Sequence, residues 1–284
     1  MRTVEDVSLV IEGGGMRGFF AGGLLKCLLD EGIRFTYVIG VSSGSLVAAA
    51  YVAQRLDLDF SQMDSSIAGF LNPRGFVRPL EGILKTDAFI DFLTGGCWPG
   101  VMASGARLLI PATDAQSGEL TWWDTPDYAE GPDALRRRIV ASSSIPFVMP
   151  QAKVDGLVYA DGGIRDSIPL DRAERDGFSR HVLVLSRPRG YVKGPQHLEL
   201  YLRHVLKPYP ALKHAMLKRH EHYNFSIRRV ERVEDEGRAF VFRMDEQNLG
   251  RFEWSPEKFA ASFESGYRYA QSRLDELAEF LDAR

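Results

Sequence analysis

The stretch VSLVIEGGGMRG, residues 7–18, decides the fold of this chain. Its first five residues, Val7 to Ile11, form a short run rich in β-branched side chains, which predicts a buried strand. The glycine-rich turn leads into a helix that Gly32 is placed to end. The inward-facing residues of this helix are Phe19, Leu24, Leu25, Leu28 and Leu29. A strand that turns directly into a helix is typical of an α/β fold.

The same alternation of short apolar runs and helical patterns continues along the chain. Thr36 to Val41 predicts a second strand, and Ser43 to Gln54 predicts a second helix. Further strands are predicted at 107–111, 120–123, 157–159, 182–186 and 240–243. Ser255 and Pro256 predict the start of a last helix. Its apolar face would hold Phe259, Phe263, Tyr267, Ala270, Leu274, Leu277 and Leu281. We therefore expect an α/β sheet covered by helices.

Composition limits the class of protein. A chain of 284 residues with 45% hydrophobic content suits one domain. The formal net charge of −3 gives no general attraction to nucleic acid. Cys27 and Cys97 form no CxxC pair, so we expect neither a disulfide framework nor a cysteine-rich metal site. The N-terminus lacks the features of a secretory signal, and no apolar run is long enough to span a bilayer. We expect a cytoplasmic protein, soluble or peripheral to the membrane.

The sequence Gly40-Val41-Ser42-Ser43-Gly44 is a GxSxG motif between a predicted strand and a predicted helix. In this context the serine sits on a strained turn that lifts its hydroxyl off the sheet. Gly40 and Gly44 remove the Cβ atoms that would collide where strand and helix pass. The helix N-terminus favours negative charge on a carbonyl oxygen under attack. The motif predicts a nucleophilic serine, and the alternative is an ordinary strand-to-helix turn.

The loop Gly13-Gly14-Gly15-Met16-Arg17-Gly18 has two interpretations. It satisfies GxGxxG, the pattern of a dinucleotide-binding turn. Such a site also needs an acidic residue at the end of the second strand, and that strand ends in Gly40, Val41 and Ser42. In a hydrolase the same glycines present backbone N–H groups to an ester carbonyl as an oxyanion hole, and Arg17 adds positive potential or anchors the loop.

The base that activates the serine is predicted to be an aspartate. All six histidines lie beyond residue 180, and none follows an obvious strand end, although a Ser-Asp-His order stays formally possible. Asp161 precedes Gly162 and Gly163 at a predicted strand end, where the glycines permit a tight turn that aims the carboxylate into a site. Taken alone, Asp-Gly-Gly is a common turn.

Four elements in this order resemble the patatin-like phospholipases: the glycine-rich loop, GxSxG, an ASxSxP-like segment at 141–146 and Asp-Gly-Gly at 161–163. The segment Ala112-Thr113-Asp114, followed by Gly118-Glu119, is also similar to that family. Glu12 stands where many relatives have Asp. The resemblance implies a three-layer α/β/α fold with a mostly parallel central sheet. It implies one catalytic domain, residues 1–284, whose core motifs occupy about 7–187 and whose residues 188–284 extend the same domain.

The resemblance also implies a Ser-Asp dyad that works without histidine, metal or cofactor. Ser42 would be the nucleophile, Asp161 the base, and Gly13, Gly14 and Gly15 the oxyanion loop, with Gly18, Gly162 and Gly163 in support. The segment 141–146 would be a structural wall of the site. The expected activity is hydrolysis of lipid acyl esters through an acyl-enzyme, as in a phospholipase A, a lysophospholipase or a carboxylesterase. The alternatives are an acyltransferase or thioesterase with the same dyad, and a lipid- or nucleotide-binding module without catalysis.

Two regions are candidates for contact with lipid. Residues 55–105 mix apolar side chains with prolines and glycines, which predicts a helical excursion that serves as a lid or a lipid-facing wall. Residues 187–232 carry eleven Lys or Arg against three Glu. Most such runs are solvated helix faces, but basic residues near an anionic membrane each add about 1 kcal/mol of attraction. Peripheral membrane contact through 187–232 is therefore an expectation, and no nucleic-acid partner is expected.

Overall fold

The computed structural model describes residues 1–60, 72–76, 78–84, 90–91, 93–195, 199–244, 250 and 255–283. The strands are β1 (Arg2–Val4), β2 (Val7–Ile11), β3 (Ile33–Phe35), β4 (Tyr37–Gly40), β5 (Arg107–Asp114), β6 (Leu120–Trp123), β7 (Ala152–Val154), β8 (Leu157–Asp161), β9 (Arg180–Leu185) and β10 (Ala239–Arg243). The α-helices are α1 (Gly18–Asp30), α2 (Ser43–Val52), α4 (Cys97–Ala103), α5 (Pro132–Ser143), α6 (Leu170–Arg175), α7 (Glu199–Val205), α8 (Pro210–Asp235), α9 (Pro256–Gln271) and α10 (Leu274–Asp282).

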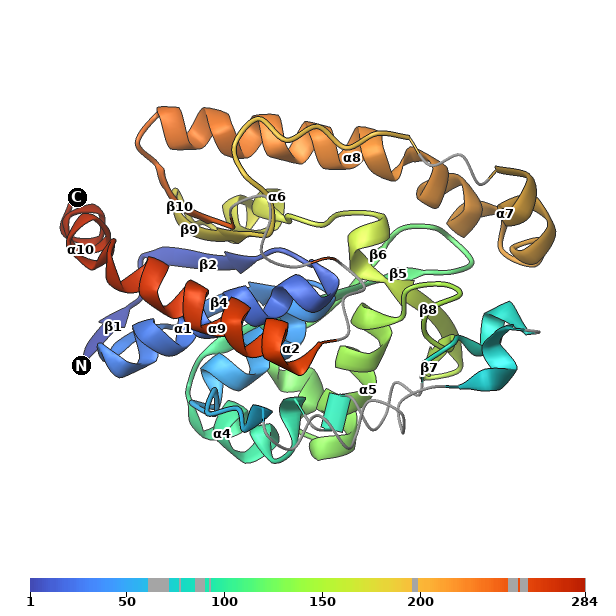
Figure 1. Ribbon diagram of the computed structural model, residues 1–284, viewed down its shortest axis with the longest axis horizontal. Coiled ribbons are helices and arrows are strands. Elements are labelled where there is room, and N and C mark those ends of the chain that lie inside the picture. The colour runs from blue at the N-terminus through green and yellow to red at the C-terminus, as the bar shows by residue number, and fades with distance from the viewer. Residues whose placement is uncertain are drawn as a thin grey trace.

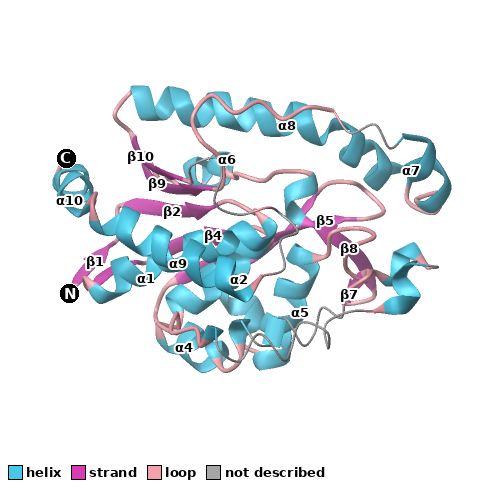
Figure 2. Ribbon diagram, viewed as in Figure 1, coloured by secondary structure: helices cyan, strands magenta, loops and turns pink. Residues whose placement is uncertain are grey.

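The central sheet has the strand order β10-β9-β2-β4-β5-β8-β7, and β6 also pairs with β5. The run from β10 to β5 is parallel, whereas β6 and β8 pair with β5 and β7 pairs with β8 in antiparallel fashion. Helices cover both faces, with α1, α2 and α9 on one side and α6 and α8 on the other (Figures 1 and 2). The predicted three-layer α/β/α fold with a mostly parallel sheet is confirmed.

Alternate residues of each central strand enter different hydrophobic cores. Leu9 of β2 lies in the same core as Leu24 of α1, whereas its neighbour Val10 lies in the core that contains Tyr223 and Ile227 of α8. This division follows from the two-residue period of a strand, whose successive side chains point to opposite faces. All five residues of β2 are buried, and four of them are apolar, as expected for a parallel strand covered on both faces; the exception is Ser8.

The first α/β unit agrees with its prediction. Strand β2 has the predicted bounds, α1 ends at Asp30, and Gly32 adopts a positive φ of 73° directly afterwards. Helix α1 then packs closely on α9, since a Cβ atom on Gly23 would lie only 1.7 Å from the carbonyl oxygen of Phe263. The C-terminal part of the chain is thereby built into the same layer as the first helix.

The prediction of one uninterrupted last helix is wrong. Ser255 caps α9 as expected, with its hydroxyl accepting a hydrogen bond from the Lys258 amide at 3.3 Å. The helix ends at Gln271, and α10 begins at Leu274. Arg273 at the break leaves the helical conformation, with φ −119° and ψ 14°, and its guanidinium donates to the carbonyl of Val241 in β10 at 2.9 Å. A hydrogen bond to the sheet thus accompanies the break.

Several elements were not predicted from the sequence. β1 and β3 pair in parallel as a small separate sheet, and β7 forms an antiparallel edge beside β8. Strand β5 continues three residues past the predicted end at Pro111, to Asp114. No helix of the described ranges combines the length and the apolar content needed to cross a membrane.

Candidate active site

Ser42 lies on the tight turn between β4 and α2, as the GxSxG motif predicts. Its backbone has φ 54° and ψ −127°, a strained conformation for a residue with a side chain. A Cβ on Gly40 would lie 2.4 Å from the carbonyl oxygen of Gly44, and a Cβ on Gly44 would lie 2.6 Å from that of Ile11. The two glycines therefore allow strand, turn and helix to pass at distances that no other residue permits.

Asp161 stands at the end of β8 and reaches the serine directly. The Ser42 hydroxyl donates a hydrogen bond to Asp161 Oδ2 at 2.5 Å. The other oxygen, Oδ1, accepts a hydrogen bond from the Gly163 amide at 2.7 Å. Ser42 and Asp161 are only 5% and 4% exposed, so the pair is shielded from bulk water. The structure brings together the two residues that the sequence predicts as nucleophile and base.

The turn after Asp161 is compact because two glycines follow the acid. A Cβ on Gly162 would lie 2.5 Å from the carbonyl oxygen of Pro111, and a Cβ on Gly163 would lie 3.0 Å from Asp161 Oδ1. Bulkier residues at either position would push the aspartate away from Ser42. This contact is the physical reason for the Asp-Gly-Gly sequence.

Two hydroxyl side chains that the sequence did not identify bind the backbone of Ser42 and Asp161. Ser142 Oγ accepts a hydrogen bond from the Ser42 amide at 3.0 Å. Thr113 Oγ1 donates to the carbonyl of Asp161 at 2.9 Å. Both residues belong to segments that were noted for their resemblance, but these bonds span 100 and 48 positions of sequence, and no local pattern reports them. Segment 141–146 is therefore part of the wall of the site.

The glycine-rich loop packs directly against the nucleophile. A Cβ on Gly13 would lie 2.9 Å from the Cβ of Ser42. The Gly14 amide already donates to Ser43 Oγ at 2.9 Å, which ties the loop to the start of α2. Among the residues that the structure describes, no hydrogen bond engages the amides of Gly13 and Gly15. Arg17, which is half-buried, follows in the short 3-10 turn that leads into α1.

The loop is held from the other side by an acidic residue. Glu12 is buried, and its Oε2 accepts a hydrogen bond from the Ser186 amide at 2.6 Å. Ser186 follows β9, so this bond joins the loop to the strand beside β2. A Cβ on Gly18, at the end of the loop, would lie 3.1 Å from the Cβ of Ser43. The loop is therefore held at one end by the residue that follows β9 and packs at the other end against the start of α2.

The buried histidine of the sheet lies in a different environment from the dyad. His181 Nδ1 is hydrogen-bonded to Ser8 Oγ at 2.8 Å, and the two residues are neighbours on the paired strands β9 and β2. Burial lowers the pKa of His181 to about 4, so the ring is neutral at pH 7. The partner of His181 is Ser8 and the partner of Ser42 is Asp161, so His181 is not placed to act as the base of Ser42.

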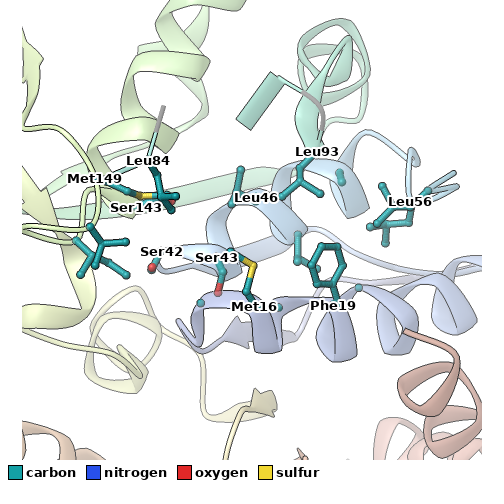
Figure 3. A pocket seen from close by; sticks show the side chains of 18 residues that line it. Met16, Phe19, Ser42, Ser43, Leu46, Leu56, Leu84, Leu93, Ser143 and Met149 are labelled. Carbon is teal, nitrogen blue, oxygen red and sulfur yellow. The ribbon is translucent and has the colours of Figure 1, made fainter. Parts of the chain in front are cut away.

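An apolar pocket begins at Ser42 and is lined by residues of α1 and α2 (Figure 3). About 760 Å³ of space lies between its walls, part of it open to solvent. Ser42 and Ser43 lie among its lining residues, together with Met16 of the 3-10 turn Gly15–Arg17, Phe19 of α1 and Leu46 of α2 (Figure 3). Leu56, Leu58, Leu84 and Leu93 also line it, so described parts of the 55–105 excursion form one wall. The remainder of that excursion includes residues outside the described ranges.

Half of the basic stretch 187–232 belongs to α8, on the sheet face opposite α1 and α2 (Figure 1). Several of its cations have acidic partners within the protein. Arg189 pairs with Asp235 at 2.5 Å, and Lys218 pairs with Glu221 at 2.7 Å. Arg229 pairs with Asp171 at 2.5 Å. Internal ion pairs thus account for part of the positive excess, and membrane contact through this stretch stays a prediction.

The family model of the patatin-like phospholipases matches residues 9–174, which contain the glycine loop, Ser42 and Asp161. The chain belongs to the patatin-like phospholipase family. A second model, a domain of unknown function called DUF6363, matches residues 209–282 of this family member. These residues include the whole of α8, β10, α9 and α10.

Relatives among known proteins agree with this assignment. The chain is 32% identical over 199 residues to the uncharacterized NTE family protein Rv1063c of Mycobacterium tuberculosis, covering 66% of this chain and 51% of that protein. It is 28% identical to the uncharacterized protein YjjU of Escherichia coli, over 67% of this chain and 54% of that protein. It is 26% identical to lysophospholipase NTE1 of Yarrowia lipolytica, over 62% of this chain and 12% of that protein. This patatin-like chain thus spans about half the length of the first two relatives.

A solved structure shares the fold. VipD from Legionella pneumophila superposes with a TM-score of 0.51 at 13% sequence identity, over 95% of this chain and 67% of that one. At this identity the likeness concerns the fold alone.

Proposed function

We propose that this protein is a serine-dependent lipid acyl hydrolase, of the phospholipase A, lysophospholipase or carboxylesterase type. One observation carries the proposal: the hydrogen bond of 2.5 Å between Ser42 Oγ and Asp161 Oδ2, at the polar end of an apolar pocket. A nucleophile within reach of its base is the basic requirement of covalent acyl transfer. An apolar pocket beside it suits an acyl chain.

In the proposed mechanism Asp161 accepts the proton of the Ser42 hydroxyl as Oγ attacks the ester carbonyl. The tetrahedral intermediate collapses when the alcohol leaves and takes up that proton, and an acyl ester on Ser42 is left. Water then attacks this ester and gives a proton to Asp161; collapse of the second tetrahedral intermediate breaks the bond to Ser42 Oγ, which takes that proton back, and the fatty acid is released. Gly163 holds the carboxylate in position throughout by donating to Oδ1.

The oxyanion formed in both steps needs donors on the glycine-loop side of Ser42. Because the Gly14 amide is bonded to Ser43 Oγ, we assign the donor role to the amides of Gly13 and Gly15. Gly14 would then position the loop. The N-terminus of α2 adds positive potential at the same place. Donors of this kind contribute about 10²- to 10³-fold to kcat each, which compensates for a carboxylate that is a weak base at neutral pH.

The substrate class is tested by measuring fatty-acid release from a lysophospholipid, a diacyl phospholipid and a p-nitrophenyl ester, with Ser42→Ala as background. We expect release from at least one lipid substrate, abolished in Ser42→Ala with an unchanged circular dichroism spectrum. Addition of an alcohol acceptor distinguishes transfer from hydrolysis, because an acyltransferase would form more alkyl ester than free acid. A folded wild type that hydrolyses none of the three substrates would contradict the proposal.

A further inference from the structure

Helix α8 packs against the turn that carries the proposed base. Ala160 and Ile164 lie on either side of this turn, and both are buried in one cluster with Leu212, Ala215 and Met216 of α8. Ala160 immediately precedes Asp161, and Ile164 ends the short 3-10 turn Gly162–Ile164. The position of the turn is therefore coupled to the position of α8 by close packing.

A polar contact reaches the same turn from the next part of the helix. Arg219 Nε donates a hydrogen bond to the carbonyl of Gly163 at 2.7 Å. Ser167 Oγ donates to the same carbonyl at 2.9 Å. The amide of Gly163 donates in turn to Asp161 Oδ1 at 2.7 Å. Arg219 of α8 and the carboxylate of Asp161, which accepts a hydrogen bond from the Ser42 hydroxyl, thus both bind the backbone of Gly163, on the two adjacent peptide units that meet at its Cα.

The geometry at Gly163 makes this coupling stiff. A Cβ built on Gly163 would lie 3.0 Å from Asp161 Oδ1 and 3.6 Å from Arg219 Nη2, so carboxylate and guanidinium approach the same side of the glycine. Each of the two peptide planes that meet at Gly163 is fixed by one of these bonds, the carbonyl by Arg219 and the amide by Asp161. A shift of the Gly163 backbone would displace its amide and with it the Asp161 carboxylate, whose Oδ2 accepts the bond from Ser42.

We propose that the C-terminal segment matched by the domain of unknown function contributes to the hydrolase site, because its residue Arg219 positions Asp161. Arg219 lies within 209–282 and outside the 9–174 match of the patatin-like model. The inference rests on the proposed dyad. It assigns a role to a segment that the catalytic motifs alone do not require.

The test compares Arg219→Ala and Arg219→Lys with Arg228→Ala, a change of an exposed arginine on the same helix. The readouts are kcat and KM for a short-chain p-nitrophenyl ester and the melting temperature. Misplacement of a catalytic group by about 1 Å costs up to about 100-fold. We expect Arg219→Ala to lower kcat by about 10- to 100-fold with KM within about twofold. Arg219→Lys should retain more of kcat, and added guanidinium should partly restore the alanine variant. Arg228→Ala should match wild type.

Ser167→Ala provides an independent variant, because Ser167 shares the Gly163 carbonyl with Arg219. Ser167→Ala alone should lower kcat less than Arg219→Ala does. Because the two residues share one acceptor, the loss of kcat in the double variant should differ from the product of the two single losses. Two results would overturn the proposal. The first is a wild-type kcat in folded Arg219→Ala. The second is a loss of kcat that neither added guanidinium nor the lysine variant reduces and that parallels a fall in melting temperature. A wild type with no more activity than Ser42→Ala would instead contradict the proposed hydrolase function, and this result is distinguishable from the other two.

Discussion

Filling the pocket at Ala50 should shorten the acyl chain that the protein accepts. Ala50 lines the pocket on α2, seven residues beyond Ser43, which corresponds to about 10 Å along the helix at 1.5 Å per residue. An acyl chain bound in the pocket reaches Ala50 only when it is long, whereas a butyryl group stays near Ser42. The change Ala50→Leu adds three carbon atoms at this level and so displaces about three methylene groups of a long chain.

At about 0.8 kcal/mol for each buried methylene, the loss for a long chain is about 2.4 kcal/mol, or about 60-fold in kcat/KM. Ala50→Val adds two carbons, and its expected loss is about 15-fold by the same estimate. The assay is kcat/KM for p-nitrophenyl esters from butyrate to laurate, with butyrate as the internal control in each variant. We expect butyrate hydrolysis to stay within about threefold of wild type, since the acyl group stays clear of Ala50. Equal losses for butyrate and laurate, or no loss for laurate, would refute the assignment of this pocket to the acyl chain.

Two further predictions concern the turn of Ser42 and the pH dependence of stability. Gly44→Ala would place a Cβ 2.6 Å from the carbonyl oxygen of Ile11, so kcat/KM should fall at least tenfold. The control is Gly194→Ala, where a Cβ meets no atom within 4 Å, and this variant should match wild type. Equal activity of the two variants would show that the close approach at Gly44 is unimportant. Desolvation raises the pKa of Asp166 to about 6, whereas an unfolded Asp has a pKa of about 3.9. Between these two pH values the folded protein holds a proton that the unfolded chain has released. The stability that this proton binding contributes is therefore lost as pH rises from about 4 through 6. Asp166→Asn should therefore raise the free energy of unfolding by about 2 kcal/mol at pH 7 and by less at pH 5. Urea unfolding at both pH values measures this difference. A gain in stability at pH 7 that is no larger than the gain at pH 5 would contradict the prediction.

Local sequence patterns predicted the parts of the fold that depend on local interactions. The bounds of β2 and β6 agree residue for residue, because a short apolar or aromatic run between turn residues defines each of them. The break between α9 and α10 was not predicted, since the apolar spacing continues through it and the bond from Arg273 to the Val241 carbonyl spans 32 positions. β1 and β3 have only three residues each, too few for a periodic pattern to be recognised.

The site divides in the same way. Ser42 and Asp161 could be predicted because glycines mark the tight turns on which they stand. Thr113, Ser142 and Arg219 could not, because each acts through one hydrogen bond to a backbone atom distant in sequence. The expectation of one domain over 1–284 stays a prediction, although β10 extends the central sheet and α9 packs on α1.

The central claim is that Asp161, with no histidine, activates Ser42. The most direct measurement is kcat/KM for a p-nitrophenyl butyrate ester in Asp161→Asn and in His181→Gln, with fluorophosphonate labelling of Ser42 as a second readout. We expect Asp161→Asn to lose about 10²- to 10⁴-fold and to label slowly, since the proton acceptor is gone. His181→Gln should keep wild-type kcat/KM, because that ring is bonded to Ser8. Activity that survives in Asp161→Asn, or that disappears in folded His181→Gln, would contradict the dyad.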